Sequence, residues 1–282
     1  MTRSTILFHK EWLLLLPRSY LYVPADNPRF LEKAETSPAD SIILDLEDGV
    51  HRTKKNLARS QALEFLSRTN RINTVLRVNN DAFSSERELI NHPKVSAIFL
   101  PKVENSASIE AFIKETGYSK KIIAFIESAQ ALRNIDQIAS HQSVVSVGLG
   151  EADLFSNIVL GEAPHSQLRA YARCQLIFAC AAHSKSAPIA PMSSNFIDLE
   201  AFKSESLELR AMGYWGRACI HPAQIEIVNE VFSADPAKIE EAQKIIEILE
   251  ASSSGAEVAL DGTMIDAAHL RWAKNYLDRI RH

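Results

Sequence analysis

The stretch Lys121–Leu154 reads KIIAFIESAQALRNIDQIASHQSVVSVGLGEADL, and it contains the pattern that decides the fold. Two continuous apolar runs, Lys121–Ser128 and Val144–Gly150, are separated by a stretch in which Ala129–Asn134 predicts a short helix. Runs that are apolar at nearly every position are typical of strands in a parallel sheet, because helices cover both of its faces. A strand, a helix and a second strand in this order predict one unit of an α/β fold.

The same alternation extends in both directions along the chain and gives eight predicted strands. The other six are Ser19–Pro24, Ser41–Asp48, Thr74–Asn79, Ala97–Val103, Ala187–Pro191 and Ala218–His221. Eight such units within about 220 residues favour a closed (β/α)8 TIM barrel over an open doubly wound sheet. No GxGxxG motif follows the first predicted strand, which argues against a dinucleotide-binding sheet.

The pattern changes after the last predicted strand. We therefore predict an N-terminal extension (residues 1–17), a barrel (residues 18–222) and a C-terminal helical extension or lid (residues 223–282). In the extension or lid, helices are predicted over Ala223–Phe232, Pro236–Ser252 and Ala267–Arg281, and the SSSG sequence at Ser252–Gly255 is typical of a linker.

The composition is that of an ordinary globular protein. The chain has 282 residues, of which 46% are hydrophobic and 23% charged, and a net charge of -4, which argues against a nucleic-acid partner. The most suspicious apolar run, WLLLL at Trp12–Leu16, is far shorter than the ~18 residues of a membrane span, so no membrane partner is expected. Cys174, Cys180 and Cys219 lack CxxC spacing, which predicts reduced thiols in a cytoplasmic protein.

Ionisable residues follow five successive predicted strands, at the end where a barrel places its active site. Glu127 follows one strand and Asp153 follows the next. Because neighbouring strands lie about 5 Å apart, both carboxylates can reach one ion, and two carboxylates with water and substrate oxygens suit Mg²⁺. The alternative for Glu127 is an ion pair with Lys102 or Arg77.

Arg77 lies near the end of the third predicted strand. Its planar guanidinium fits a carboxylate through two parallel hydrogen bonds, so it is a candidate for binding a substrate carboxylate. The alternative is an ion pair with Glu47 or Asp48, and the two interpretations are compatible.

Seven motifs occur in order along the chain. They are RSYLYVPADNPRFLEKA (Arg18–Ala34), ILDLEDGV (Ile43–Val50), LRVN (Leu76–Asn79), LPKVE (Leu100–Glu104), IESAQAL (Ile126–Leu132), GLGEADL (Gly148–Leu154) and GRACIHPAQIEIVN (Gly216–Asn229). This ordered set resembles the citrate lyase β-subunit-like family of the HpcH/HpaI aldolase superfamily, over residues 18–270. The resemblance implies a (β/α)8 barrel, a bound Mg²⁺ and cleavage or formation of a carbon–carbon bond in a 3-hydroxyacyl thioester.

The resemblance also implies roles for individual residues. Glu127 and Asp153 correspond to the metal ligands, and Glu47 and Asp48 to residues that hold water on the metal. Arg77 corresponds to the clamp for the α-keto-acid carboxylate, and the backbone of Glu151, Ala152 and Asp153 to hydrogen-bond donors for the keto acid. Asp266 corresponds to an acid supplied by a neighbouring subunit's lid. Arg18, Arg29 and Lys33, taken to lie near the exit of the first strand, are weaker candidates for coenzyme A phosphates, with a solvated face as the alternative.

The expected function is that of a Mg²⁺-dependent lyase. It would cleave a short 3-hydroxyacyl-CoA, of the citramalyl-CoA or malyl-CoA type, to acetyl-CoA and an α-keto acid, and it would assemble as a homo-trimer or hexamer. The alternatives are the β subunit of a citrate lyase complex, acting on an acyl-carrier-protein thioester, and a non-catalytic ligand-binding member. Ala190 and Pro191 depart from the family, which often has an aspartate there, and this bears on the acyl-group preference.

Overall fold

The computed structural model describes residues 17–71, 73–156, 158, 166–252, 256–258 and 262–280. The chain divides into two compact units. We call Pro17–Phe232 the sheet unit and the described residues from Ser233 onward the C-terminal unit. The WLLLL run falls outside the described residues.

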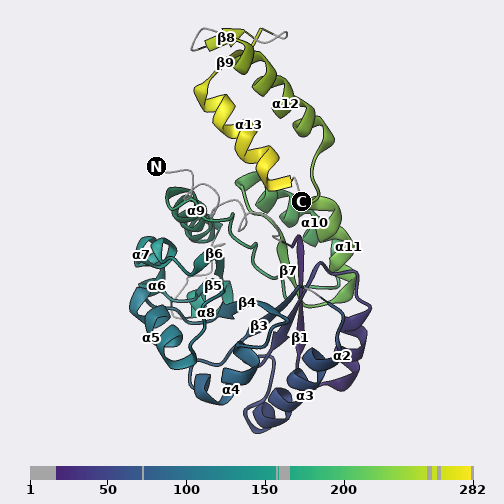
Figure 1. The fold of residues 1–282 in the computed structure, drawn as a ribbon. Coiled ribbons are helices and arrows are strands. Elements are labelled where there is room, and N and C mark those ends of the chain that lie inside the picture. The colour runs from purple at the N-terminus through teal and green to yellow at the C-terminus, as the bar shows by residue number, and fades with distance from the viewer. Residues whose placement is uncertain are drawn as a thin grey trace. The chain divides into compact units, whose positions relative to one another are not determined.

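A seven-stranded parallel sheet forms the centre of the sheet unit, with strand order β6-β5-β4-β3-β2-β1-β7 (Figure 1). Its strands are β1 (Ser19–Pro24), β2 (Ser41–Asp45), β3 (Thr74–Arg77), β4 (Val95–Leu100), β5 (Lys121–Ile126), β6 (Val144–Leu149) and β7 (Arg217–Cys219). Each of β1 to β5 lies beside the next strand in the chain, as strand–helix–strand units require, and β7 lies beside β1. The predicted α/β class and the parallel sheet are therefore confirmed.

The seventh predicted strand, Ala187–Pro191, does not form a regular strand, whereas the eighth, Ala218–His221, corresponds to β7. Ile189 makes a parallel bridge to Gly148 of β6, and Ala190 makes one to Arg217 of β7. Pro188 and Pro191 have no N–H group to donate, so the segment cannot build a continuous ladder. The described residues thus contain seven strands of one sheet and a bridging segment, where an eight-stranded barrel was expected.

Helices surround the strands on the outside (Figure 1). They are α2 (Pro28–Glu35), α3 (Lys55–Arg68), α4 (Phe83–Ile90), α5 (Ser106–Thr116), α6 (Ala129–Arg133), α7 (Ile135–Ser140), α8 (Glu151–Ser156), α9 (Ser166–Ala182), α10 (Leu199–Met212) and α11 (Ile225–Val231). The sequence patterns did not predict α7, α8 and α10. The signal for α10 was present, because the Asp198 side chain caps its start and Gly213 ends it in a left-handed conformation.

Both faces of the sheet are buried, which explains the continuous apolar runs. Along β2, Ile42 and Leu44 pack in the layer beneath the helices, whereas Ile43 points to the other face. The cluster on that inner face consists of Tyr20, Ile43, Val75, Ala97, Phe99, Ile123, Phe125 and Ile189. The bridging segment, through Ile189, thus shares the interior with side chains from five strands, β1 to β5.

The C-terminal unit contains two helices, α12 (Pro236–Ala251) and α13 (Ala267–Ile280), and an antiparallel pair of short strands, β8 (Ala256–Val258) and β9 (Met264–Asp266). Its own apolar cluster is Ala242, Ile245, Ile265, Ala273 and Leu277. Both helices were predicted, but the strand pair was not. Among the described residues, no helix has the length and hydropathy that a membrane span requires.

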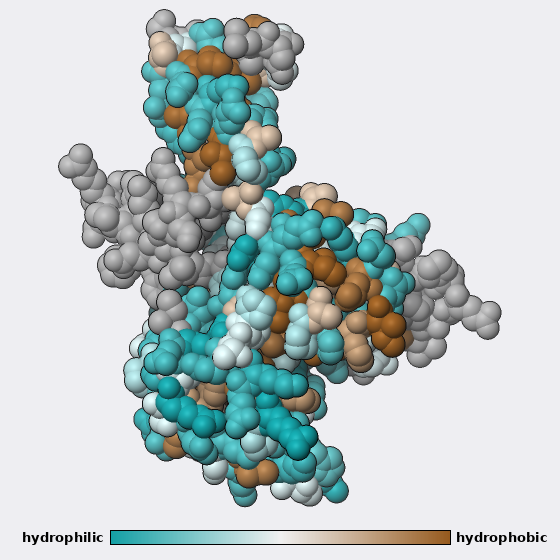
Figure 2. Space-filling view, turned by 90° about the vertical axis from the view of Figure 1, so that its right-hand side faces the viewer, coloured by the Kyte–Doolittle hydropathy of each residue, from teal (hydrophilic) through white to brown (hydrophobic). Residues whose placement is uncertain are grey.

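The face of the protein that Figure 2 shows mixes hydrophilic areas with groups of hydrophobic residues among the coloured atoms. Large apolar side chains that are exposed include Met192, Phe196 and Ile197, in the segment between Pro191 and α10. Ile197 is 85% exposed.

Candidate active site

A cavity of about 730 Å³ opens at the carboxyl ends of the strands. Its wall includes residues from the ends of β1, β2, β3, β5 and β6, from the segment that follows Ala190, and from the residues after β7. Six acidic residues and two arginines line it: Asp45, Asp48, Glu127, Glu151, Asp153, Glu205, Arg77 and Arg169. This excess of carboxylates favours a bound cation over a bare anionic ligand.

Arg77 is held by the carboxylates of Asp45 and Glu47. Asp45 and Arg77 end neighbouring strands and lie opposite each other in the register. The Asp45 carboxylate accepts hydrogen bonds from Arg77 Nε at 2.8 Å and Nη2 at 2.7 Å, and Arg77 Nη1 lies 3.0 Å from Glu47 Oε2. Burial disfavours the charged guanidinium, but the bonds to Asp45 and the surrounding negative charge outweigh it, so the pKa of Arg77 is raised.

The predicted alternative for Arg77 therefore holds in part, with Glu47 as a partner and Asp45 as the closer one. A guanidinium has five N–H groups, and the pair with Asp45 uses Nε–H and one N–H of Nη2. The outer N–H groups on Nη1 and Nη2 form the edge that can meet a further carboxylate. Asp45 fixes the plane of the guanidinium, so this edge has one orientation.

Asp45 was not among the predicted site residues, although a local signal for it exists. Its carboxylate also accepts hydrogen bonds from the backbone N–H groups of Glu47 at 2.8 Å and Gly49 at 3.0 Å. A Cβ atom on Gly49 would lie 2.2 Å from Asp45 Oδ2, so this close approach requires glycine. An aspartate at a strand end that is followed four residues later by glycine, as in LDLEDG, is the sequence trace of this turn.

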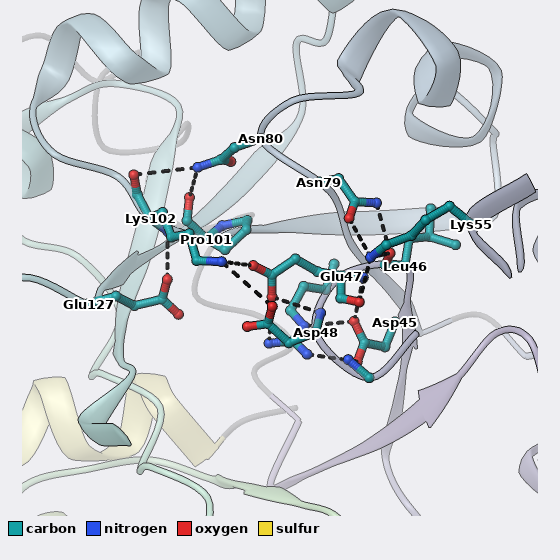
Figure 3. Close-up of polar contacts among 12 residues, drawn as sticks. Asp45, Leu46, Glu47, Asp48, Lys55, Asn79, Asn80, Pro101, Lys102 and Glu127 are labelled. Carbon is teal, nitrogen blue, oxygen red and sulfur yellow. Dashed lines mark hydrogen bonds and ion pairs between the residues drawn. The ribbon is translucent and has the colours of Figure 1, made fainter. Parts of the chain in front are cut away.

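Lys102 joins the two acidic sides of the cavity (Figure 3). Its backbone N–H donates to Glu127 Oε2 at 2.7 Å, and its ammonium lies 2.6 Å from Glu47 Oε1 and 3.6 Å from Asp48 Oδ1. Lys102 adopts a left-handed φ of 52°, which is uncommon for a residue with a side chain. Burial raises the pKa of Glu47, although Arg77 and Lys102 oppose the shift.

A second polar network supports the loop that carries Glu47 (Figure 3). Lys55 donates to the carbonyl oxygens of Leu46 and Glu47, both at 2.6 Å, and to Asn79 Oδ1 at 2.7 Å. Asn79 in turn donates to the Leu46 carbonyl at 2.8 Å and to Glu86 Oε1 at 2.5 Å. Lys55 and Asn79 therefore fix the loop through its backbone carbonyl groups.

The predicted metal ligands both line the cavity, from adjacent strands. Glu127 directly follows β5, and Asp153 lies in the first turn of α8, which follows β6. Burial raises the pKa of Glu127 to about 7, and the negative charges of Glu47 and Asp153 act in the same direction. The carboxylates are therefore near enough to repel each other. The predicted alternative differs from the structure, because Lys102 meets Glu127 through its backbone, and no ion pair reaches Glu127 within the described parts of the chain.

This donor set fits a hard divalent cation. Carboxylate oxygens that crowd in a buried cavity are stabilised by such an ion, and Mg²⁺ typically keeps several water molecules beside one or two carboxylates. In the ranges that the structure describes, no group of three or more His, Cys, Asp and Glu residues converges as a complete metal cage. Glu127 and Asp153 would thus leave the remaining positions to water and substrate.

The structure separates the three residues predicted for coenzyme A. Arg29 and Lys33 are exposed on α2, which follows the carboxyl end of β1. Arg18 precedes β1, at the opposite end of the strand from the cavity, so its expected place near the exit of the strand is wrong. Its guanidinium binds Asp40 through Nε at 2.8 Å and Nη2 at 3.0 Å.

Asp266 ends β9 in the C-terminal unit and caps α13. Its carboxylate accepts hydrogen bonds from the backbone N–H of Ala268 at 2.8 Å and of His269 at 3.3 Å. The His269 side chain, 2.9 Å away, and these N–H groups lower the pKa of Asp266. Locally, Asp266 is a helix cap.

Comparison with known proteins identifies the family of the chain. The family model of HpcH/HpaI aldolase/citrate lyase matches residues 18–222. A (3S)-malyl-CoA thioesterase of Cereibacter sphaeroides is 33% identical over 268 residues, which cover 92% of this chain and 93% of that protein. The citrate lyase subunit beta of Haemophilus influenzae is 31% identical over 287 residues, which cover 94% of this chain and 97% of that protein.

A solved structure is similar over nearly the whole chain. It is the protein CitE from Mycobacterium tuberculosis in complex with magnesium, acetoacetate and coenzyme A, with a TM-score of 0.74 and 25% sequence identity. The match covers 94% of this chain and 98% of that one. The chain therefore belongs to the HpcH/HpaI aldolase/citrate lyase family, and it is a lyase of the citrate lyase β-like type.

Proposed function

We propose that the protein is a Mg²⁺-dependent carbon–carbon lyase that cleaves a short 3-hydroxyacyl-CoA, of the citramalyl-CoA or malyl-CoA type, to acetyl-CoA and an α-keto acid. The observation that carries the proposal is the pairing of Glu127 and Asp153 in one acidic cavity with Arg77. The Mycobacterium tuberculosis relative, which was solved with magnesium and coenzyme A, supports it. Ala187–Pro191 would complete the sheet as the eighth member of a barrel.

The residues of this chain divide the chemistry between them. Bound Mg²⁺ would supply a Lewis acid for the substrate oxygen that becomes the ketone. The outer N–H groups of Arg77 bind the substrate carboxylate, and Asp45 keeps the guanidinium in one plane, so the scissile bond has one orientation. Glu47 and Asp48 would hold water on a bound Mg²⁺, and the backbone N–H groups of Glu151, Ala152 and Asp153 are candidate donors to the keto acid.

The bond that breaks joins the hydroxyl-bearing carbon to the carbon next to the thioester. The hydroxyl group loses its proton and becomes the ketone, and the electron pair of the broken bond passes to the thioester fragment as an enolate. That carbon must then receive a proton from a positioned acid. We assign this acid to Asp266 of a neighbouring subunit in a homo-trimer or hexamer, with closure of the lid excluding water.

Part of the cavity lining is apolar. Ala190, Pro191 and Met192 belong to it, together with Ala218 and Ile220. Such a lining favours a hydrogen or methyl substituent on the keto acid, as in glyoxylate or pyruvate, over a substituent with a second carboxylate. Arg29 and Lys33 remain the candidates for contact with the coenzyme A phosphates.

One experiment distinguishes this proposal from its rivals. Citramalyl-CoA and malyl-CoA are each incubated with the protein and Mg²⁺, and α-keto acid, acetyl-CoA and free thiol are measured together. A lyase releases keto acid and acetyl-CoA in equal amounts without free thiol. Free thiol without keto acid would indicate thioester hydrolysis, the activity in the name of the Cereibacter sphaeroides relative. Turnover confined to an acyl-carrier-protein thioester would indicate a citrate lyase subunit, and no turnover with any of them a binding protein.

A further inference from the structure

A chain of five charged side chains runs along one side of the cavity into the interior of the sheet unit. Glu151 lies between two arginines, with Oε2 3.2 Å from Arg169 Nε and Oε1 2.6 Å from Arg173 Nε. Glu205 lies between two as well, with Oε1 2.8 Å from Arg173 Nη2 and Oε2 bonded to Arg217 Nη2. We call this series, from Arg169 to Arg217, the arginine–glutamate chain.

The inner members of the chain are deeply buried. The side chain of Arg217 is 0% exposed and that of Arg173 is 9% exposed. Arg217 also donates to the Pro191 carbonyl at 3.0 Å and to Ser206 Oγ at 2.6 Å. Buried ion pairs are usually no more stabilising than apolar side chains of the same volume, whereas they do require defined positions of their partners. A gain in stability is therefore a weak explanation for the arginine–glutamate chain. A better explanation is that it fixes the positions of the segments it joins.

The two ends of the chain reach two walls of the cavity. Glu151 is the first residue of α8, and Asp153 lies two residues further along the same helix. At the other end, the Pro191 carbonyl that Arg217 binds directly precedes Met192, which lines the cavity. Glu205 joins both halves, because each of its oxygens meets a different arginine.

We propose that Glu205 is a positioning residue: through Arg173 and Glu151 it fixes the start of α8, and with it the Asp153 carboxylate. The inference rests on the proposed function in that Asp153 is taken as a Mg²⁺ ligand. Glu205 acts at a distance, since both of its oxygens already have arginine partners. The side chain of Glu151 also helps to fix the start of α8. This role is separate from any hydrogen bond that the Glu151 backbone donates to substrate.

The test measures Mg²⁺ binding to the purified metal-free protein by titration calorimetry. Glu205→Gln keeps the size of the side chain and removes its charge. Loss of a residue in direct contact with a metal ligand typically weakens metal binding 10- to 100-fold. Glu205 acts through Arg173 and Glu151, so we expect the lower end of that range, a dissociation constant about tenfold higher. Glu230→Gln is the matched control, because it breaks an exposed 2.8 Å pair with Lys203 of the same helix as Glu205. It is expected to leave Mg²⁺ binding unchanged.

A second variant separates positioning from charge balance. Glu205→Gln combined with Arg217→Met removes the carboxylate and the buried guanidinium together. On our proposal the melting temperature recovers toward that of the unaltered protein, while the Mg²⁺ dissociation constant stays about tenfold higher. Unchanged binding in Glu205→Gln, or restored binding in the double variant, would overturn the inference and leave the proposed function intact. An unaltered protein that binds no Mg²⁺ would overturn the proposed function itself.

Discussion

Gly150 lies directly against the side chain of Glu127. A Cβ atom at position 150 would stand 2.6 Å from Glu127 Cγ and 2.8 Å from Oε1, closer than real contacts allow. The end of β6 therefore forms the floor on which the carboxylate that follows β5 rests. Gly150, the second glycine of GLGEAD, leaves room for the Glu127 side chain, which follows the neighbouring strand. From the sequence alone, Gly150 is only the residue at the end of a predicted strand.

Gly150→Ala is expected to displace the Glu127 carboxylate and so to weaken Mg²⁺ binding and turnover by at least about tenfold. The fold should be retained, since the added methyl group meets a side chain and not the backbone. Calorimetric titration with Mg²⁺ and a thermal melt check both points. Gly117→Ala is the control: it strains a left-handed helix end, at a cost of about 1 kcal/mol, without reaching the cavity. Equal Mg²⁺ affinity in the two variants would contradict the prediction.

Mg²⁺ binding is expected to depend on pH below 7. The pKa of Glu127 is raised from 4.5 to about 7 in the folded protein, so the folded state keeps this proton where the unfolded state has lost it. Without metal, stability should therefore fall as pH rises from about 4.5 to about 7, by at most about 3 kcal/mol. Mg²⁺ must displace the proton, so its affinity should rise up to tenfold per pH unit and level off above pH 7.

Thermal melts in a chelator, and Mg²⁺ titrations in buffers of different ionisation enthalpy, measure these two effects. Glu127→Gln has no proton to release. It should abolish Mg²⁺ binding and flatten the dependence of stability on pH over the same interval. A variant that keeps the full pH dependence would assign it to another group.

Arg77→Lys is expected to damage catalysis although it keeps the charge. A lysine cannot bind Asp45 through two parallel bonds and also present a flat edge to the substrate. The loss of a charged hydrogen bond in a buried site corresponds to about 2–3 kcal/mol, or roughly 30- to 150-fold in rate. Steady-state kinetics measure it. Arg18→Lys breaks a pair of the same geometry with Asp40 at the other end of β1 and is expected to lower the melting temperature without lowering kcat.

Asp266→Asn is expected to keep the fold and Mg²⁺ binding and to lose most turnover. Asparagine caps a helix as well as aspartate does, so α13 should persist. Mixing this variant with Glu127→Gln and allowing subunits to exchange tests the assignment to a neighbouring subunit, because mixed oligomers then contain some complete sites. If exchange is demonstrated and no activity returns, Asp266 acts within its own subunit or outside the chemistry.

Much of the framework could be predicted from the sequence, because its signals are local. Continuous apolar runs located the six strands β1 to β6, and the carboxylates after β5 and β6 were identified as a pair from their position at the strand ends. Ala187–Pro191 was expected to be a strand because its residues are apolar, but Pro188 and Pro191 limit its ladder. A hydropathy pattern does not indicate how many backbone N–H groups a segment can donate to neighbouring strands.

The contacts that hold the site could not be predicted in the same way. Asp45 was counted within a strand, and its pairing with Arg77 depends on the register between two strands, which the residues of either strand do not specify. The arginine–glutamate chain joins residues from four separate elements. Arg18 was placed at the wrong end of β1 although the predicted strand begins at Ser19, as β1 does, because a residue that precedes the strand was taken to lie near its exit.

The left-handed backbone conformation of Lys102 limits which amino acids can replace it during evolution. Only glycine, and to a lesser degree asparagine and aspartate, adopts such a φ without a cost of about 1 kcal/mol or more. Those three residues would relax the backbone, but none carries an ammonium for Glu47. Arginine would keep the charge and the strain together. At position 102, backbone stability therefore favours glycine, asparagine or aspartate, whereas the ion pair with Glu47 requires a cationic side chain. The lysine that is present keeps the ion pair at a cost in stability.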